Sequence, residues 1–378
     1  MALKEIDARK GPRKLLALDG GGIRGLMTVE VLGRLEEVLG AARREAGTLA
    51  KDAPFVLADY FDYIGGTSTG AILAAGLSKG LSVAALRKFY LESGSEMFDK
   101  SSLLRRHKYK YEDGALVQQL IEVFGDGTLG SDYLRTYLLM VLRNASTDSP
   151  WPMSNNPRAK YNDRKRDNCN LDLPLWQLVR ASTAAPTYFP PEVFSVKRGL
   201  EHVFVDGGVT MYNNPAFQLY LMATLAPYNL EWPSGEDQML VVSVGTGQAA
   251  AANQGLGPSD MNILYNATSI PSALMSAALN EQDLLCRVFG RCLVGHELDR
   301  ELGSLADVEN PGGAKHFTYL RYNAELSREG LDALGLPHIK PDQVSALDSV
   351  GGIPHLQELG VAVGNKLVDP THFKKFLE

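Results

Sequence analysis

The sequence predicts an α/β fold, a three-layer sandwich in which helices cover both faces of a mostly parallel central sheet. Residues 14–18 form an apolar run typical of a buried strand, and residues 26–39, after a glycine-rich turn, place their apolar side chains on one helical face. The next stretch repeats this plan, because residues 60–66 are strand-like and a helix begins near Gly70. Repeated units of strand, turn and helix indicate parallel strands covered by helices.

Further segments continue this alternation along the chain. Strands are expected at 137–142, 202–205 and 239–247, and helices at 83–92, 175–182 and 215–225. Mostly helical sequence follows, and residues 316–323 predict a late strand. Long loops are expected near 144–170, which is polar and rich in Pro and Asn, and near 249–260. Since no linker-like segment divides the chain, we expect one domain over residues 1–378.

Composition and charge narrow the classes of function. The net charge of -6 argues against a nucleic-acid partner bound through bulk electrostatics. The 3 cysteines form no C-x-x-C pair, which argues against a disulfide framework and favours the reduced cytoplasm. No apolar run approaches the roughly 18 residues of a membrane span, so any membrane contact is expected to be peripheral. No zinc-ligand spacing or EF-hand loop is present, and we expect neither a metal nor a cofactor.

The first chemical motif is "GGTSTG", which places Ser68 in a G-x-S-x-G pattern between a strand and a helix. Such a turn needs small flanking residues, here Gly66 and Gly70, and it exposes the serine oxygen at the helix N-terminus. The pattern therefore predicts a nucleophile. The alternative is a glycine-lined turn in which Ser68 caps the following helix.

The second motif is "DGGGIRG", which begins at Asp19 and satisfies G-x-G-x-x-G after the first strand. A dinucleotide-binding loop would need an acidic residue about twenty positions on, at the end of a second strand. The acidic residues in that region stand in helix-like or loop-like sequence: Glu36, Glu37 and Glu45. The other use of such a loop is to direct backbone N–H groups at a developing oxyanion.

The proton acceptor for Ser68 is the next question. None of the 7 histidines stands in a distinctive motif, and His202 heads a strand-like segment, where strand packing is the simpler role. Asp206 ends that segment before two glycines. We expect its carboxylate to reach a serine at the end of a neighbouring parallel strand, because ligand sites in such sheets collect at the carboxyl ends. The alternative is a turn aspartate that binds local backbone N–H groups.

Together these motifs resemble the patatin-like phospholipase family, as do "RASTAAPTYFPP" (residues 180–191) and "VDGGVTMYNNPA" (residues 205–216). The resemblance implies a patatin-like sandwich and a serine–aspartate dyad, with Ser68 as nucleophile and Asp206 as base. It also implies an oxyanion region made by Gly20, Gly21, Gly22 and Arg24. This chain has D-G-G where many relatives have D-G-A, which is a small departure.

The implied activity is that of a lipid acyl hydrolase that cleaves fatty-acyl esters of membrane phospholipids at the inner membrane surface. Arg24 is expected to compensate charge near the oxyanion or a substrate phosphate; the alternative is an ion pair with Asp19 that fixes the loop. Two other functions stay open. One is a dinucleotide-binding oxidoreductase that uses "GGGIRG", and the other is a catalytically idle binding protein.

Residues 281–303 are similar to the C-terminal part of bacterial patatin-like effectors that cyclic dinucleotides switch on in antiviral (anti-phage) defence. The resemblance implies a cyclic nucleotide activator, and we expect activation to be accompanied by ligand-dependent assembly into an oligomer or by ordering of a loop. Phosphate-binding charge is expected from Arg287, Arg291 and the basic patches 105–110 and 158–166. In the alternative, the enzyme is a constitutive lipase whose arginines pair with nearby carboxylates, namely Asp283, Glu297 or Asp299.

Overall fold

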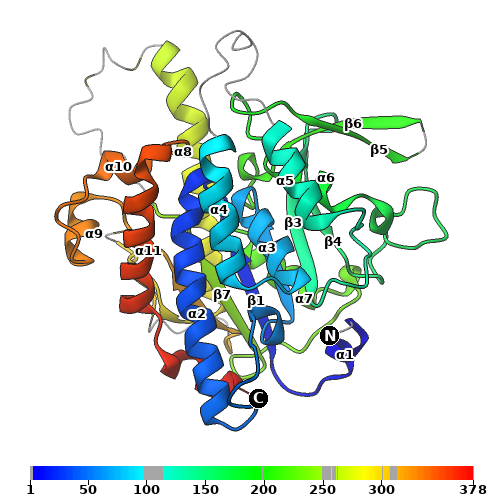
Figure 1. Ribbon diagram of the computed structural model, residues 1–378, viewed down its shortest axis with the longest axis horizontal. Helices are drawn as coiled ribbons and strands as arrows, with labels where there is room; N and C mark the ends of the chain where they lie inside the picture. The colour runs from blue at the N-terminus through cyan, green and yellow to red at the C-terminus, as the bar shows by residue number, and fades with distance from the viewer. Residues whose placement is uncertain are drawn as a thin grey trace.

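The computed structural model describes residues 3–97, 114–197, 199–248, 257, 261, 263–299, 301–306 and 313–377 (Figure 1). The strands in this part of the chain are β1 (Arg13–Leu18), β2 (Tyr63–Thr67), β3 (Tyr137–Asn144), β4 (Ser149–Ser154), β5 (Glu192–Lys197), β6 (Leu200–Asp206), β7 (Met239–Val244), β8 (Arg291–Val294) and β9 (Thr318–Tyr322). The helices are α1 (Leu3–Ala8), α2 (Gly25–Glu45), α3 (Thr69–Lys79), α4 (Val83–Met97), α5 (Gly114–Phe124), α6 (Leu175–Ser182), α7 (Ala216–Thr224), α8 (Ile263–Phe289), α9 (Arg328–Ala333), α10 (Pro341–Ser345) and α11 (Ile353–Leu367).

The nine described strands form one sheet. Its order is β5-β6-β3-β2-β1-β7-β9-β8, and β4 pairs with β3 beside this path. The pairs among β1, β2, β3, β7, β8 and β9 are parallel, whereas β4, β5 and β6 pair antiparallel. Leu18 of β1 lies opposite Gly66 of β2 and Val244 of β7, so the carboxyl ends of these three strands align at one edge.

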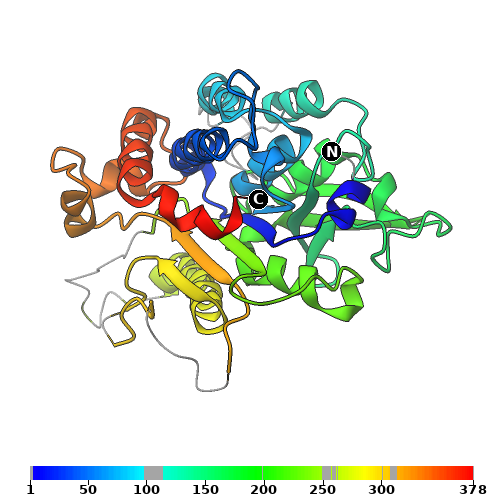
Figure 2. The ribbon, with the colours of Figure 1, turned by 90° about the horizontal axis from the view of Figure 1, so that it is seen from below.

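The buried side chains of β1 alternate between two cores, because successive side chains of a strand point to opposite faces. Leu16 and Leu18 belong to the core shared with α2, α3, α4, α5, α6 and α11. Leu15 and Ala17 belong to the second core, with α1, α7 and α8. Figure 2 shows these two layers of helices above and below the sheet, which confirms the predicted α/β sandwich with a mostly parallel sheet.

The prediction of one long loop at 144–170 is wrong in part, because β4 forms inside it and pairs antiparallel with β3. Its sequence contains Pro150 and Pro152, which argue against a strand in the middle of a sheet. In the described part of the chain β4 pairs with β3 alone, and an edge strand tolerates a missing N–H. Strands β5 and β8 were not predicted either. The loop expected near 249–260 falls almost entirely outside the described residues, and the single domain stays a prediction.

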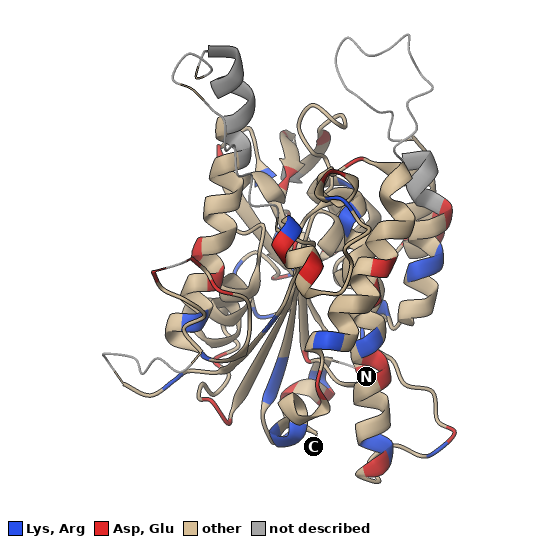
Figure 3. Ribbon diagram, turned by 90° about the vertical axis from the view of Figure 1, so that its left-hand side faces the viewer, with Lys and Arg blue, Asp and Glu red and all other residues tan. Residues whose placement is uncertain are grey.

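Along the ribbon in Figure 3, positions of basic and acidic residues are interspersed. The expected basic patch at 105–110 lies outside the described residues. In the patch at 158–166, Arg158 lies 3.1 Å from Asp7 and Arg164 lies 2.6 Å from Asp172. Two of its cations therefore already have carboxylate partners. Among the described residues, no helix combines the length and the hydropathy that a membrane crossing requires.

Candidate active site

Ser68 stands alone between β2 and α3, in a sharp turn with φ 56° and ψ -125°. A backbone of this kind costs a non-glycine residue about 1–3 kcal/mol and is concentrated at functional sites. The flanking glycines are required by space, because a Cβ at Gly66 would overlap with the Gly70 carbonyl and a Cβ at Gly70 with the Leu18 carbonyl. The Ser68 side chain makes no capping hydrogen bond to α3, so the helix-cap alternative does not hold.

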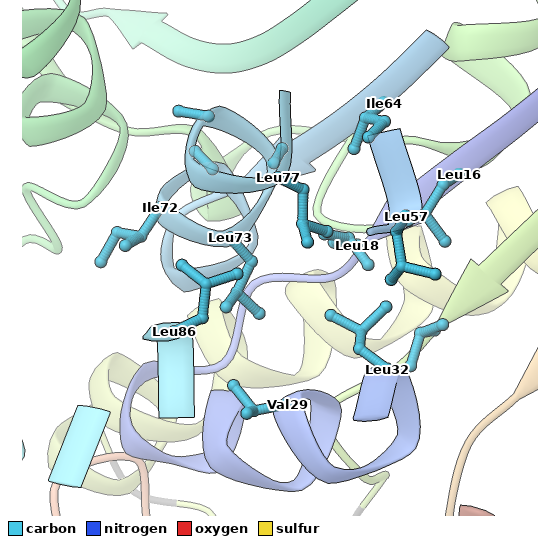
Figure 4. Close-up of a cluster of buried hydrophobic side chains, with 14 of the residues drawn as sticks. Leu16, Leu18, Val29, Leu32, Leu57, Ile64, Ile72, Leu73, Leu77 and Leu86 are labelled. Atoms are coloured by element: carbon cyan, nitrogen blue, oxygen red, sulfur yellow. The ribbon is translucent and has the colours of Figure 1, made fainter. Parts of the chain in front are cut away.

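The helix that follows Ser68 is anchored in the core. Leu73 and Leu77 of α3 are buried and lie beside Leu18 at the end of β1 (Figure 4). α3 is therefore a rigid base for the turn, and its first N–H groups face the position of Ser68. The N-terminus of a helix favours negative charge, which is the charge that an attacked ester develops.

Asp206 lies against Ser68. The Ser68 hydroxyl donates a hydrogen bond of 2.6 Å to Asp206 Oδ2, and the Gly208 N–H donates one of 2.6 Å to Asp206 Oδ1. The side chain is buried, with 4% exposed. Burial raises the pKa of Asp206 to about 6, while the hydrogen bonds from Ser68 and Gly208 and the charge of Arg180 oppose that rise. A carboxylate with this pKa is a better proton acceptor near neutral pH than an exposed one.

The register of β3 explains how the two residues meet. Val141 of β3 lies opposite Thr67 of β2, and the next residue, Leu142, lies opposite Asp206 of β6. Because β4 occupies the other edge of β3, β2 and β6 share one edge and run toward each other. The expectation that Asp206 ends a neighbouring parallel strand is therefore wrong, since β6 is antiparallel and pairs with β3 rather than with β2.

His202 has a different environment. It lies four residues before Asp206 on β6, its Nδ1 is 2.5 Å from Asn144 Nδ2, and its ring packs beside Trp151. In the part of the chain that the structure describes, the Ser68 hydroxyl bonds to Asp206 and to no histidine. The strand-packing role expected for His202 agrees with this environment.

The glycine-rich loop, residues 20–22, lies directly beside Ser68. A Cβ on Gly20 would come within 3.1 Å of the Ser68 Cβ. The N–H of Gly20 donates to the Asn213 carbonyl at 3.1 Å, so Gly20 permits close approach but is not a free donor, contrary to expectation. Within the described residues, the N–H groups of Gly21 and Gly22 donate no hydrogen bond. They are the loop's available donors.

Residues distant in sequence hold this loop, and sequence reasoning missed them. The Thr246 hydroxyl donates to the Gly20 carbonyl at 3.0 Å, and the Leu347 carbonyl accepts from the Ile23 N–H at 2.9 Å. Gly22 has φ 58°, and a Cβ there would overlap with the Leu347 carbonyl. A signal for Thr246 exists in "VVSVGTG", since its position just after a predicted strand puts it at the same edge of the sheet as Ser68.

Asp19, at the start of the loop, is bound by Arg321 of β9. Both oxygens of Asp19 accept from the Arg321 guanidinium, at 2.9 and 2.6 Å, and each side chain is 1% exposed. Among the described residues, no ion pair at contact distance joins Arg24 to Asp19. Burial lowers the pKa of Arg24 to about 10, although the charge of Asp19 still acts to raise it. The Arg24 Nε is buried with no hydrogen-bond partner in the part of the chain that the structure describes. Arg24 thus keeps donor capacity for an anion.

Arg287 was expected to supply phosphate-binding charge, and this expectation is wrong. Its Nε and Nη2 donate to the two oxygens of Asp283 at 2.9 and 2.8 Å, and its side chain is 1% exposed. Arg291 pairs at the surface with Glu236. Arg287 on α8 and Arg291 on β8 therefore both pair with carboxylates, as in the alternative, although Glu236 was not among the partners expected for them.

The dinucleotide-binding alternative finds no support in the described geometry. Glu36, Glu37 and Glu45 all lie on α2 rather than at the end of a second strand, where a ribose-binding carboxylate would stand. Among the described residues, no group of three or more His, Cys, Asp or Glu side chains is arranged to hold a metal ion.

The sequence is similar to those of known phospholipases and patatins. An 85/88 kDa calcium-independent phospholipase A2 of Mus musculus is 30% identical over 261 residues, covering 64% of this chain and 28% of that protein. Patatin-17 of Solanum cardiophyllum is 32% identical over 249 residues, covering 62% and 60%. A cGAMP-activated phospholipase of Escherichia coli (strain TW11681) is 29% identical over 252 residues, covering 65% of each chain.

This chain thus spans less than two thirds of the length of each of these relatives. The family model described as patatin-like phospholipase matches residues 16–220, which include the glycine-rich loop, Ser68 and Asp206. That match covers more than half of the 378 residues. The chain belongs to the patatin-like phospholipase family.

Proposed function

We propose that this protein is a lipid acyl hydrolase that cleaves fatty-acyl esters of membrane phospholipids, with Ser68 as nucleophile and Asp206 as general base. The observation that carries the proposal is the 2.6 Å hydrogen bond from the Ser68 hydroxyl to the buried Asp206 carboxylate. Gly21 and Gly22 are the proposed oxyanion donors, and Gly20 keeps the loop close to Ser68. Family membership supports the same chemistry.

In the acylation step, Ser68 Oγ attacks the ester carbonyl carbon while its proton passes to Asp206 Oδ2. The carbonyl oxygen becomes an oxyanion facing the N–H groups of Gly21 and Gly22. When this intermediate collapses, the ester bond breaks, and the leaving alcohol takes the proton from Asp206. Water then gives a proton to Asp206 and attacks the acyl-serine, and the fatty acid leaves as Ser68 regains its proton.

Two substitutions with an intact fold test this assignment. Ser68→Ala removes the nucleophile and Asp206→Asn removes the base, so each is expected to abolish release of fatty acid from phospholipid vesicles. A fluorophosphonate probe is expected to label Ser68 in the unsubstituted protein, detected by mass spectrometry of the labelled peptide. Release at the unsubstituted rate by folded Ser68→Ala would overturn the proposal. If the assignment holds, profiling mixed phospholipids by mass spectrometry would define the preferred head group and the acyl position that is cleaved.

Arg24 has two proposed uses that one experiment separates. Its unpartnered Nε supports a role for the guanidinium with an anion, either the developing oxyanion or the phosphate of the substrate. Arg24→Ala is expected to lower turnover of phospholipid. An equal loss on an uncharged ester assigns Arg24 to the oxyanion, and a loss on phospholipid alone assigns it to the phosphate. Unchanged turnover of both substrates would remove both roles.

Peripheral contact with a bilayer is proposed through α8. Gln248, beyond the carboxyl end of β7, donates to Asn280 at 2.6 Å, so the part of α8 before Asn280 extends past the catalytic edge of the sheet (Figure 1). Residues 270–280 contain no charged residue, and Ile270 and Leu274 are 50% and 65% exposed. Met211, five residues after Asp206, is 45% exposed as well. Uncharged, exposed apolar side chains at this edge suit an interfacial enzyme.

Leu274→Glu tests this contact, with Val361→Glu on α11 as the control. Val361 is 46% exposed but belongs to the other helical layer. We expect Leu274→Glu to lower vesicle binding and vesicle hydrolysis about tenfold, because a buried leucine contributes roughly 1.5–3 kcal/mol. Hydrolysis of a water-soluble ester is expected to stay unchanged. Equal losses in both variants, or an unchanged Leu274→Glu, would contradict the contact.

We also propose that a cyclic nucleotide activates the protein, which would give it a role in antiviral defence in the cytoplasm. It is supported by the similarity to a protein named cGAMP-activated phospholipase. Release of fatty acid would be measured with and without a panel of cyclic di- and trinucleotides. A low basal rate that one of them raises is expected, together with ligand-dependent assembly. Full basal activity and no heat of binding in calorimetry would contradict it.

A further inference from the structure

The backbone N–H of the nucleophile itself is already occupied. It donates to the hydroxyl oxygen of Ser182, at the end of α6, over 3.0 Å. The Ser182 hydroxyl donates its own proton to the Val141 carbonyl of β3 at 2.7 Å, so its lone pair is left to face Ser68. Ser182 is 0% exposed, and solvent cannot replace either bond.

The same segment also holds the base. Two residues after Ser182, the Ala184 carbonyl accepts from the backbone N–H of Asp206 at 3.0 Å. Residues 182–184 therefore contact the backbone on both sides of the 2.6 Å hydrogen bond between Ser68 and Asp206. They also contact Val141 of β3, the strand along which β2 and β6 converge.

We propose that Ser182 is a positioning residue that holds Ser68 in its left-handed backbone conformation and thereby sets the contact between Ser68 and Asp206. The inference rests on the proposed function. A strained backbone persists only where its surroundings over-determine it, and the bond from Ser68 N–H to Ser182 supplies such a constraint. Without the hydroxyl, the buried N–H has no acceptor, and rotation of that peptide would carry the Ser68 side chain away from Asp206.

A second consequence concerns the oxyanion. Since Ser182 already takes the Ser68 N–H, that group is not a donor for the reacting carbonyl. The donors from the loop side are then the N–H groups of Gly21 and Gly22.

Ser182→Ala is the direct test, and Ser78→Ala is the matched control. Ser78 is also a serine with 0% exposure, and its hydroxyl accepts from Thr136 at 2.8 Å, but it lies at the opposite end of α3 from Ser68. On a water-soluble ester, we expect kcat of Ser182→Ala to fall about 10- to 100-fold with KM nearly unchanged. Ser78→Ala is expected to keep the kcat of the unsubstituted enzyme.

The pH dependence of kcat/KM distinguishes a loss of positioning in Ser182→Ala from a general loss of folded protein. The Ser68 hydrogen bond lowers the pKa of Asp206, so weakening it is expected to move the acid limb of kcat/KM in Ser182→Ala to higher pH. Ser182→Thr keeps a hydroxyl and is expected to restore both the rate and the midpoint in part. A destabilised enzyme with an intact dyad would lose rate without moving the midpoint.

The rate at which a fluorophosphonate labels Ser68 gives a reading that does not depend on the lipid substrate. We expect it to fall about 10- to 100-fold in Ser182→Ala, in line with kcat. Unchanged labelling and an unmoved acid limb in folded Ser182→Ala would overturn the positioning role, whatever the outcome for Ser182→Thr. Activity that persists in Ser68→Ala would instead overturn the proposed function, so the two failures are distinguishable.

Discussion

The two sides of the candidate active site are held by different parts of the chain. The dyad side is held by Val141, Ser182 and Ala184, all within residues 16–220 that match the family model. The glycine-rich loop is held by Thr246, Arg321 and Leu347, which all lie beyond that match. Thr246 is 226 residues from its partner Gly20, and Arg321 is 302 residues from its partner Asp19. The proposed nucleophile is thus fixed within the matched region, whereas the proposed oxyanion donors depend on residues beyond position 220.

The largest effect is expected on the dyad side. Ser68→Ala and Asp206→Asn should each lower kcat on a soluble ester by about 10⁴-fold or more. The two residues act together, so the loss of either one removes most of the catalysis that the pair provides. The check is steady-state kinetics with far-UV circular dichroism to confirm folding. A loss below about tenfold in folded Asp206→Asn would assign the base to another group.

On the loop side, the largest effect is expected from Arg321→Met. It leaves Asp19 buried and unpaired, which costs about 3–5 kcal/mol of the free energy of unfolding. The double variant Asp19→Asn/Arg321→Met removes the stranded charge and should recover part of this loss. Arg291→Met, which breaks an exposed pair with Glu236, should cost less than about 1 kcal/mol. Denaturant unfolding checks all three, and equal costs for Arg321→Met and Arg291→Met would contradict the account.

Substitution of Gly22, with Gly47 as its control, tests the contribution of the glycine-rich loop to activity. Gly22 and Gly47 both have positive φ, at 58° and 71°, but only at Gly22 would a Cβ overlap with another atom, the Leu347 carbonyl. Gly22→Ala is expected to displace a proposed oxyanion donor and to lower kcat about 10²-fold. Gly47→Ala carries the same backbone strain in open space and should leave kcat unchanged. Parallel losses in both variants would indicate strain alone.

A smaller effect is expected on the free energy of unfolding, because the buried Asp206 is less stable when it is charged. The pKa of Asp206 is about 6 in the fold against 3.8 in the reference state, so the folded protein holds this proton more tightly than the unfolded chain does. The free energy of unfolding therefore falls as pH rises from about 4 to about 6, by up to about 3 kcal/mol. Asp206→Asn lacks this penalty and should be more stable than the unsubstituted protein above pH 6, with the difference vanishing near pH 4. Thermal unfolding across pH checks this, and a destabilised Asp206→Asn at pH 8 would contradict it.

Local patterns were enough to predict the turn at Ser68, the strand that ends at Asp206 and the position of the glycine-rich loop. Each depends on a short stretch in which small residues follow an apolar run, and the structure has a strand at each of those runs. The direction of β6 was not predictable from such a stretch. The alternation of side chains along a strand does not show whether the strand runs parallel or antiparallel to its neighbour. Only the pairing with β3 shows that β6 is antiparallel.

The residues that hold the site in place could not be predicted from local patterns either. Ser182 and Arg321 act through partners that lie 114 and 302 residues away in sequence. Ser182 lies in the family-like stretch 180–191, but nothing in that stretch shows that its hydroxyl accepts from Ser68. Nothing around Arg321 distinguishes it from any other strand arginine. Gly20 shows the same limit, since only the fold reveals that its N–H is taken by Asn213.

The proposed mechanism assigns the proton of Ser68 to Asp206 and to no histidine. It is tested most directly by the pH dependence of kcat/KM on an uncharged soluble ester, measured for the unsubstituted protein and for single variants of all 7 histidines. We expect activity to fall below a midpoint at about pH 6, where Asp206 becomes protonated, and we expect the same midpoint in every histidine variant. A folded histidine variant, His202→Ala above all, that is as inactive as Ser68→Ala or that lacks this acid limb would contradict it.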